Sequence, residues 1–271
     1  MDGRQVVSAL HSGSLVYGTH ITSTSPTLPG LLRSVGLDLV FIDTEHVPID
    51  RAVLSWMCLA YGALGLAPMV RIPEPDPYRA SMVLDGGARG VLAPYVETPE
   101  QVRALVGAVK YRPLKGRRLK RFLEGQEFLE PELLAYLEER NAENFLVANI
   151  ESRPAIEALD EILAVPGLDA VLIGPHDLTC SLGIPEQYDH PRFREAVETI
   201  LEKARTHNLG CGVHFWREPD RQVEWARAGA NLLMHHGDNS LFVQSVRADL
   251  QEIKGALDDH RATPTAIEAQ V

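Results

Sequence analysis

The sequence contains no long run of basic residues and no long run of apolar ones. Its 271 residues include 26 lysines and arginines against 37 aspartates and glutamates, which gives a formal net charge of −11. An acidic chain without a basic patch is a poor partner for nucleic acid or for an anionic membrane surface. No apolar stretch approaches the roughly 20 residues that a transmembrane helix needs. We therefore expect neither a nucleic-acid partner nor a membrane partner.

Cysteine is also scarce. Cys58, Cys180 and Cys211 are an odd number of widely spaced residues, without the paired spacing of zinc ligands. Reduced thiols in a cytoplasmic protein are the expectation. The first 13 residues, MDGRQVVSALHSG, have the pattern of a short amphipathic helix rather than of a secretory signal.

Eight short apolar runs recur along the chain, and helical patterns separate them. The runs are 14–21, 37–43, 67–72, 89–96, 145–151, 169–174, 210–215 and 231–236. They are continuously apolar, as strands of a parallel sheet are when both faces are buried. Between them, Thr98-Pro99 has the pattern of a helix start, and 191–207 carries one apolar stripe. The alternation predicts an α/β fold, a (β/α)8 TIM barrel, and 45% hydrophobic residues suffice for its core.

One interval breaks the rhythm. Residues 111–144 are too long for a simple connection between the fourth and fifth strands, and we interpret them as an insertion in a single domain. The sequence leaves open whether the insertion shapes the site or passes under the barrel. We expect the barrel, with its N-terminal and C-terminal helices, to occupy 1–257, and 258–271 to form a flexible tail.

Ionisable residues gather where the predicted strands end. In a TIM barrel the chemistry is found at the C-terminal ends of the strands. The residues at those ends are His20, Asp43, Glu45, His46, Arg71, Asn149, Glu151, the run Gly174-Pro175-His176-Asp177, His235 and His236. A polar pocket at one end of the barrel is the expected result.

Glu151 and Asp177 follow consecutive strands, which lie about 4.8 Å apart in a sheet. Two carboxylates without cysteine or paired histidine suit a hard divalent cation, Mg²⁺ or Mn²⁺, with water and substrate oxygens completing an octahedron. Each carboxylate alone is equally explained by a helix cap or an ion pair. The turn at 174–177 offers backbone N–H groups to a small carboxylate, or is an ordinary turn.

Arg71 and His46 are the candidates for stabilising charge and moving a proton. A guanidinium at a strand end can hold an oxygen on which negative charge develops, or can simply pair with Glu45 or Asp43. His46 is a candidate acid/base, with Asp43 as the partner that orients it, although a surface or capping histidine explains it as well.

At these residues the sequence resembles a known family, the metal-dependent class II pyruvate aldolases of the HpcH/HpaI type. The resemblance runs from about residue 5 to 255. The matching blocks are FIDTEHVP (41–48), VRIP (70–73), LDGGARGVLAPYVETPEQ (84–101), NIESRPAIEALDEILAVPGLDAVLIGPHDLTCSLG (149–183) and HPRF (190–193). The last two blocks are specific in their order and spacing.

The resemblance implies a barrel of the phosphoenolpyruvate/pyruvate type and a reversible aldol reaction that yields pyruvate, or a related 2-keto acid, and an aldehyde. It implies Glu151 and Asp177 as ligands of Mg²⁺ or Mn²⁺, with Co²⁺ possible. Arg71 would stabilise the enolate, and His46 with Asp43 would act as acid/base. Residues 174–177 would hold the pyruvate carboxylate. Asp85 would complete a neighbouring subunit's site in a homohexamer, a trimer of dimers.

Some positions depart from the family pattern. Asn149 stands in place of a glutamine, His20 in place of an aromatic residue and His176 in place of a small one, and we expect these three to contact substrate. The changes leave the identity of the aldehyde open. The roles of Glu45, His235, His236 and the insertion stay open too.

Two other functions stay open. An acyl-CoA thioester lyase of the malyl- or citryl-CoA type would share the enolate chemistry, and only 112–121 offers basic groups for the CoA phosphates. A non-catalytic barrel that serves as a binding protein is the second. No lysine stands at a strand end, which argues against a Schiff-base mechanism.

Overall fold

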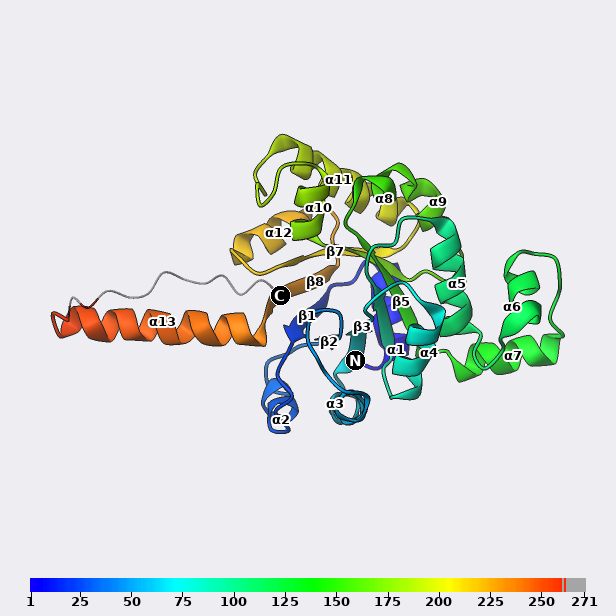
Figure 1. The fold of residues 1–271 in the computed structure, drawn as a ribbon, viewed down its shortest axis with the longest axis horizontal. Helices are drawn as coiled ribbons and strands as arrows, with labels where there is room; N and C mark the ends of the chain where they lie inside the picture. The colour runs from blue at the N-terminus through cyan, green and yellow to red at the C-terminus, as the bar shows by residue number, and fades with distance from the viewer. Residues whose placement is uncertain (260, 262–271) are drawn as a thin grey trace.

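Eight parallel strands close into a barrel in chain order in the computed structural model, which describes residues 1–259 and 261 (Figure 1). The strands are β1 (Val16–Ile21), β2 (Leu39–Asp43), β3 (Ala67–Arg71), β4 (Gly90–Ala93), β5 (Phe145–Ile150), β6 (Ala170–Ile173), β7 (Gly210–Phe215) and β8 (Leu232–Gly237). The predicted TIM barrel and all eight predicted strands are confirmed.

Helices surround the barrel and connect its strands. They are α1 (Gly3–Ser12), α2 (Leu28–Leu32), α3 (Arg51–Ala63), α4 (Pro77–Asp85), α5 (Pro99–Lys110), α6 (Gly116–Leu123), α7 (Pro131–Arg140), α8 (Arg153–Glu157), α9 (Leu159–Leu163), α10 (Pro175–Ser181), α11 (Pro191–Thr206), α12 (Pro219–Arg227) and α13 (Asp238–Ala256). The predicted cap is present, because the Thr98 side chain accepts a hydrogen bond from the Gln101 N–H.

Side chains alternate along each strand between the barrel interior and the helical layer. The interior cluster includes Leu39, Phe41, Leu92 and Leu172, and the outer faces of the strands pack against the helices in a second, larger cluster. The expected N-terminal helix is α1, whose Leu10 joins the interior cluster. Because α1 precedes β1, it covers the N-terminal end of the barrel and leaves the C-terminal end of the strands for the site.

Residues 111–144 contain α6 and α7, which extend together from one side of the barrel (Figure 1). They follow α5 and precede β5, so the chain leaves and re-enters the barrel at the end opposite the C-terminal ends of the strands. Arg118 pairs with Glu127 and Glu130 within this segment. The segment contributes nothing to the pocket described below.

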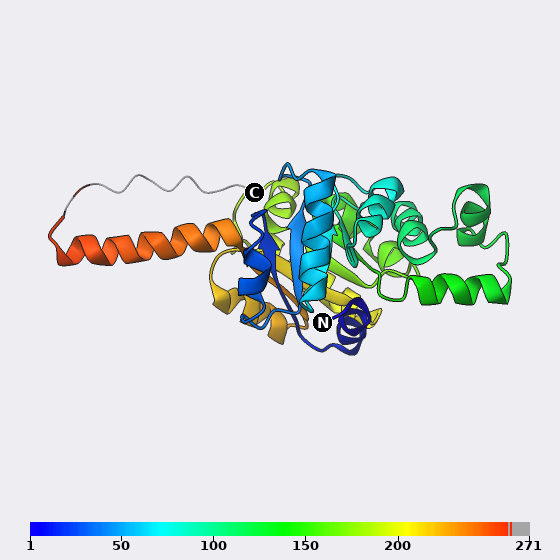
Figure 2. The same ribbon diagram turned by 90° about the horizontal axis from the view of Figure 1, so that it is seen from below.

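The last helix, α13, projects away from the barrel, as both ribbon views show (Figures 1 and 2). None of its described side chains is buried, although Phe242, Val246, Leu250 and Ile253 are apolar. In the part of the chain that the structure describes, no helix is both long and apolar enough to cross a membrane. The expected flexible tail lies almost wholly outside the described residues.

Candidate active site

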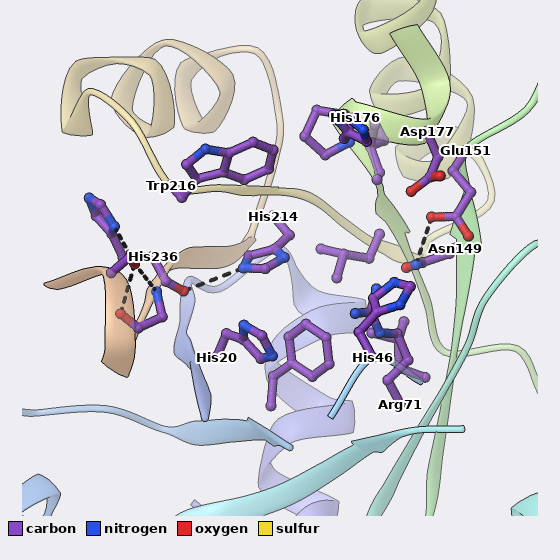
Figure 3. Close-up of a pocket in the computed structure, with 18 of the residues that line it drawn as sticks. His20, His46, Arg71, Asn149, Glu151, His176, Asp177, His214, Trp216 and His236 are labelled. Carbon is purple, nitrogen blue, oxygen red and sulfur yellow. Dashed lines mark hydrogen bonds between the residues drawn. The ribbon is translucent and has the colours of Figure 1, made fainter. Parts of the chain in front are cut away.

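A pocket of about 310 Å³ opens at the C-terminal ends of the strands (Figure 3). It brings together nearly all of the candidate site residues. Those that line it are His20, His46, Arg71, Asn149, Glu151, Gly174, Pro175, His176 and Asp177. Its floor is the upper layer of the barrel interior, formed by Phe41, Leu92 and Leu172.

Arg71 and Asp43 form a buried, two-armed ion pair beneath this pocket. The Arg71 Nε donates to Asp43 Oδ1 and its Nη2 donates to Asp43 Oδ2, both at 2.8 Å. Burial alone would raise the pKa of Asp43, but His20 and the Arg71 guanidinium hold that pKa well below its usual range. Asp43 is therefore ionised, and it fixes the plane of the guanidinium.

The pairing of Asp43 with His46 is not what the structure shows. The Asp43 oxygens are taken up by Arg71 and by the Glu45 N–H, and the carboxylate next to His46 is Glu45, with 3.8 Å between Oε2 and the imidazole Nε2. Glu45 also lies 3.2 Å from Arg71 Nε, which confirms it as a partner of Arg71. Asp43 points into the barrel as the last residue of β2, whereas Glu45 and His46 follow in the loop.

Glu151 is buried just after β5, and donors reach both of its carboxylate oxygens. Oε1 accepts from the Tyr95 N–H at 2.7 Å, and Oε2 accepts from the Asn149 side-chain amide at 2.9 Å. Gly174 makes room for this carboxylate, because a Cβ there would lie 2.2 Å from Glu151 Oε2. Burial raises the pKa of Glu151 to about 7, and the charge of Asp177 contributes to the rise.

Asp177 lies in the first turn of α10, on the same side of the pocket as Glu151 (Figure 3). Its Oδ1 accepts a hydrogen bond from the Tyr95 hydroxyl at 3.1 Å. Burial also raises the pKa of Glu45, with Asp177 among the contributing charges. Glu45, Glu151 and Asp177 thus lie near one another, and the nearby Arg71 is already paired with Asp43. The pocket has an excess of negative charge, which favours a cation.

The donor set fits a hard divalent cation. Glu151 and Asp177 supply oxygens, and the buried Oδ1 of Asn149 has no hydrogen-bond partner in the described structure. Among the described residues, no group of three or more histidine, cysteine or carboxylate side chains is arranged to hold a metal. The protein would therefore supply two ligands, and water and substrate oxygens the rest, as is usual for Mg²⁺.

The opposite wall of the pocket is built from imidazole and indole rings. Of its residues, His20 and His236 were predicted from the sequence, whereas His214 and Trp216 were not. His20, His214, Trp216 and His236 lie together there (Figure 3). The His20 and His214 ring centroids are 5.4 Å apart, and burial lowers the pKa of His214 to about 3. His214 and Trp216 were missed because GCGVHF shows only an apolar run. The available signal was that His214 lies next to the last residue of the predicted strand, where the other candidate residues gather.

Asp43, Glu45, Asp85 and His235 do not line the pocket, although Asp43 pairs with Arg71 and Glu45 lies beside His46. Asp85 ends α4, where it is exposed and pairs with Arg112 at 2.6 Å. Of the two adjacent histidines of β8, His236 lines the pocket and His235 does not. Within this chain Asp85 reaches none of the other site residues, so its contribution to a neighbouring subunit's site stays a prediction.

Comparison with known proteins identifies the relatives of this chain. A model of the HpcH/HpaI aldolase/citrate lyase family matches residues 17–244. A hydroxypyruvate/pyruvate aldolase of Roseovarius nubinhibens is 33% identical over 245 residues, covering 90% of this chain and 94% of the relative. A 2-keto-3-deoxy-L-rhamnonate aldolase of Klebsiella pneumoniae is 31% identical over 242 residues, covering 89% and 90%. The crystal structure of an HpcH/HpaI aldolase from Desulfitobacterium hafniense matches with a TM-score of 0.79 at 28% identity, covering 91% of this chain and 95% of that one.

Proposed function

Because the chain belongs to the HpcH/HpaI aldolase/citrate lyase family and is a carbon–carbon lyase, we propose that it cleaves a 4-hydroxy-2-keto acid reversibly. The products are pyruvate, or a related 2-keto acid, and an aldehyde, and the reaction depends on Mg²⁺ or Mn²⁺, with Co²⁺ as a further candidate. The observation that carries this proposal is the convergence of Glu151 and Asp177 in the pocket that Arg71 also lines.

Each residue has a role that its position supports. Glu151 and Asp177 would hold the metal, which supplies a Lewis acid that lowers the cost of enolate charge. Asp43 fixes the orientation of the Arg71 guanidinium plane. Arg71 would thereby place a positive charge where negative charge develops on the enolate oxygen. The backbone at 174–177 binds the keto-acid carboxylate at the start of α10.

We assign the transfer of the aldol hydroxyl proton to His46. This imidazole is half exposed at the pocket edge, with Glu45 beside it, so it can take the proton of the aldol hydroxyl and return it during condensation. Asn149 and His176 line the same side of the pocket as the metal ligands, and His20 lines the other (Figure 3). We propose that Asn149 and His176 contact the keto acid and that His20 contacts the aldehyde.

The thioester-lyase alternative is less well supported. The basic segment 112–121 lies outside the pocket, and Arg112 and Arg118 are each engaged by carboxylates, Asp85 for the former and Glu127 with Glu130 for the latter. CoA phosphates that bound to Arg112 or Arg118 would have to displace these pairs.

We also propose that the working form is a homo-oligomer, a hexamer built as a trimer of dimers. The apolar side chains of α13 have no cover within the described chain, and a second copy would bury them. The cytoplasmic location expected from the cysteine content stays a prediction.

The test is exchange of the pyruvate methyl protons with D₂O, followed by NMR. We expect exchange that requires Mn²⁺ or Mg²⁺, stops with EDTA, and falls at least about a hundredfold in Glu151→Gln and in Asp177→Asn. Glu100→Gln, at an exposed glutamate of α5, is the matched control and keeps the wild-type rate. Exchange that persists in EDTA, or that is absent from folded, metal-loaded enzyme, would contradict the proposal.

A further inference from the structure

Tyr95 contacts both of the carboxylates that we propose as metal ligands, through two different groups. It lies two residues after β4, in the loop that leads to α5. Its φ angle is +46°, in the left-handed region that disfavours any residue with a Cβ. This backbone conformation directs the Tyr95 N–H to Glu151 Oε1 at 2.7 Å. A glycine would supply the same N–H without the conformational cost, so the side chain must account for a tyrosine here.

The side chain reaches the second carboxylate. The Tyr95 hydroxyl donates to Asp177 Oδ1 at 3.1 Å, although the residue is 44% exposed. A partly exposed tyrosine side chain could rotate so that its hydroxyl bonds only to water. Here the hydroxyl instead donates to the Asp177 carboxylate at the pocket edge. Asp177 Oδ2 accepts no hydrogen bond from the described residues, so Oδ2 keeps both lone pairs for a ligand, whereas Oδ1 keeps one.

Glu151 is restricted in a similar way. Tyr95 N–H occupies one of its oxygens and the Asn149 amide the other, at 2.7 and 2.9 Å. Each oxygen keeps one lone pair, and the carboxylate cannot rotate without losing a hydrogen bond. A carboxylate fixed in this manner offers a cation only the lone pairs that these two hydrogen bonds leave free, and any other arrangement of its oxygens would require it to turn.

We propose that Tyr95 is a positioning residue that keeps Glu151 and Asp177 as one-oxygen ligands and so makes the site select a small octahedral cation over Ca²⁺. The proposal rests on the metal site of the proposed function. Mg²⁺ demands near-ideal octahedral geometry, whereas Ca²⁺ takes six to eight oxygens in flexible geometry and readily uses two-oxygen carboxylates. If the Tyr95 hydroxyl is removed, Asp177 is no longer held in the orientation that octahedral coordination of a small ion requires. Its second oxygen then becomes available as an additional ligand for Ca²⁺.

The experiment is titration calorimetry of Mn²⁺ and of Ca²⁺ into the metal-free, full-length protein and into Tyr95→Phe. This variant removes one hydroxyl and keeps the ring and the backbone N–H. We expect the Mn²⁺ dissociation constant to rise about tenfold, as for other groups that orient a ligand, while that of Ca²⁺ stays level or falls. The ratio of the two constants is the readout, because a general loss of structure would weaken both ions alike.

Two further variants complete the test. Tyr95→Gly removes the phenol but suits the left-handed backbone, so it should reproduce the change in the ratio even if Tyr95→Phe folds poorly. Tyr78→Phe, at an exposed tyrosine of α4, should leave both constants unchanged. An unchanged Mn²⁺ to Ca²⁺ ratio in both Tyr95 variants overturns this inference alone. Failure of the folded wild-type protein to bind either ion overturns the metal site of the proposed function as well.

Discussion

Arg71 holds Asp43 with two parallel hydrogen bonds of 2.8 Å, and this pair joins the ends of two neighbouring strands at the base of the pocket. The Asp43 side chain is wholly buried and that of Arg71 is 10% exposed. A buried pair of this kind is costly to break, because the remaining charge loses its partner without regaining water. The geometry thus ties the orientation of the Arg71 guanidinium, which we propose stabilises the enolate, to the stability of the barrel.

Asp43→Asn is expected to lower both stability and catalysis. Removing one partner of a buried pair costs roughly 3 kcal/mol, which is on the order of 6–12 °C in Tm for a chain of this size. Arg71→Lys keeps the charge but loses the planar fork, so we expect kcat for pyruvate proton exchange to fall at least about tenfold. Calorimetry and the exchange assay measure the two effects.

The matched control is Arg103→Lys, which alters the exposed pair of Arg103 with Glu100 in α5. Exposed pairs contribute about 0–1 kcal/mol, so Tm should change little. A variant of Arg71 that exchanges pyruvate protons at the wild-type rate would show that the guanidinium does not act on the enolate.

The barrel and most of its pocket could be predicted because both depend on the positions at which strands end. A parallel barrel brings all C-terminal strand ends to one face, so Glu151 and Asp177 meet there whatever the details of packing. The same logic places His46 and Arg71 at the pocket. Their catalytic and ligand roles are still predictions.

What could not be predicted depends on register and on local backbone conformation. Whether Asp43 meets His46 or Arg71 is decided by the pairing of β2 with β3, which sets Asp43 opposite Arg71. Tyr95 was missed because its two contacts require a left-handed backbone two residues beyond a strand. The projection of α13 away from the barrel was not predicted, because an amphipathic helix normally packs its apolar face on the barrel of its own chain.

His214 is expected to make folding stability depend on pH. Its pKa is about 3 in the folded protein because burial disfavours the charged ring, whereas an unfolded histidine titrates near 6.5. Between these values the unfolded state binds a proton that the folded state does not, so stability is lost as pH falls below 6.5. The slope from this residue is about 1.4 kcal/mol per pH unit.

Urea unfolding in EDTA at several values between pH 4.5 and 7.5 measures this effect. His214→Gln lacks the titrating ring, so its stability should rise relative to that of the wild type as the solution is acidified. His207→Gln, at an exposed histidine after α11, controls for the substitution itself. If the wild-type and His214→Gln curves stay parallel over this range, His214 is not protonated on unfolding.

Asp85 gives a test of whether the site is shared between subunits. Within one chain it is exposed at the end of α4, whereas Glu151 is buried in the pocket, so an effect of Asp85 on catalysis requires a neighbouring copy.

We expect Asp85→Asn and Glu151→Gln each to be inactive in pyruvate proton exchange as separate preparations. When the two are co-expressed, about a quarter of the sites should combine an intact Glu151 with an intact Asp85 from the neighbour in a closed oligomer. Activity that returns on co-expression therefore shows a site built by two subunits. An inactive mixture of demonstrated mixed composition, or full activity of Asp85→Asn alone, would instead restrict the active site to the residues that one chain brings together.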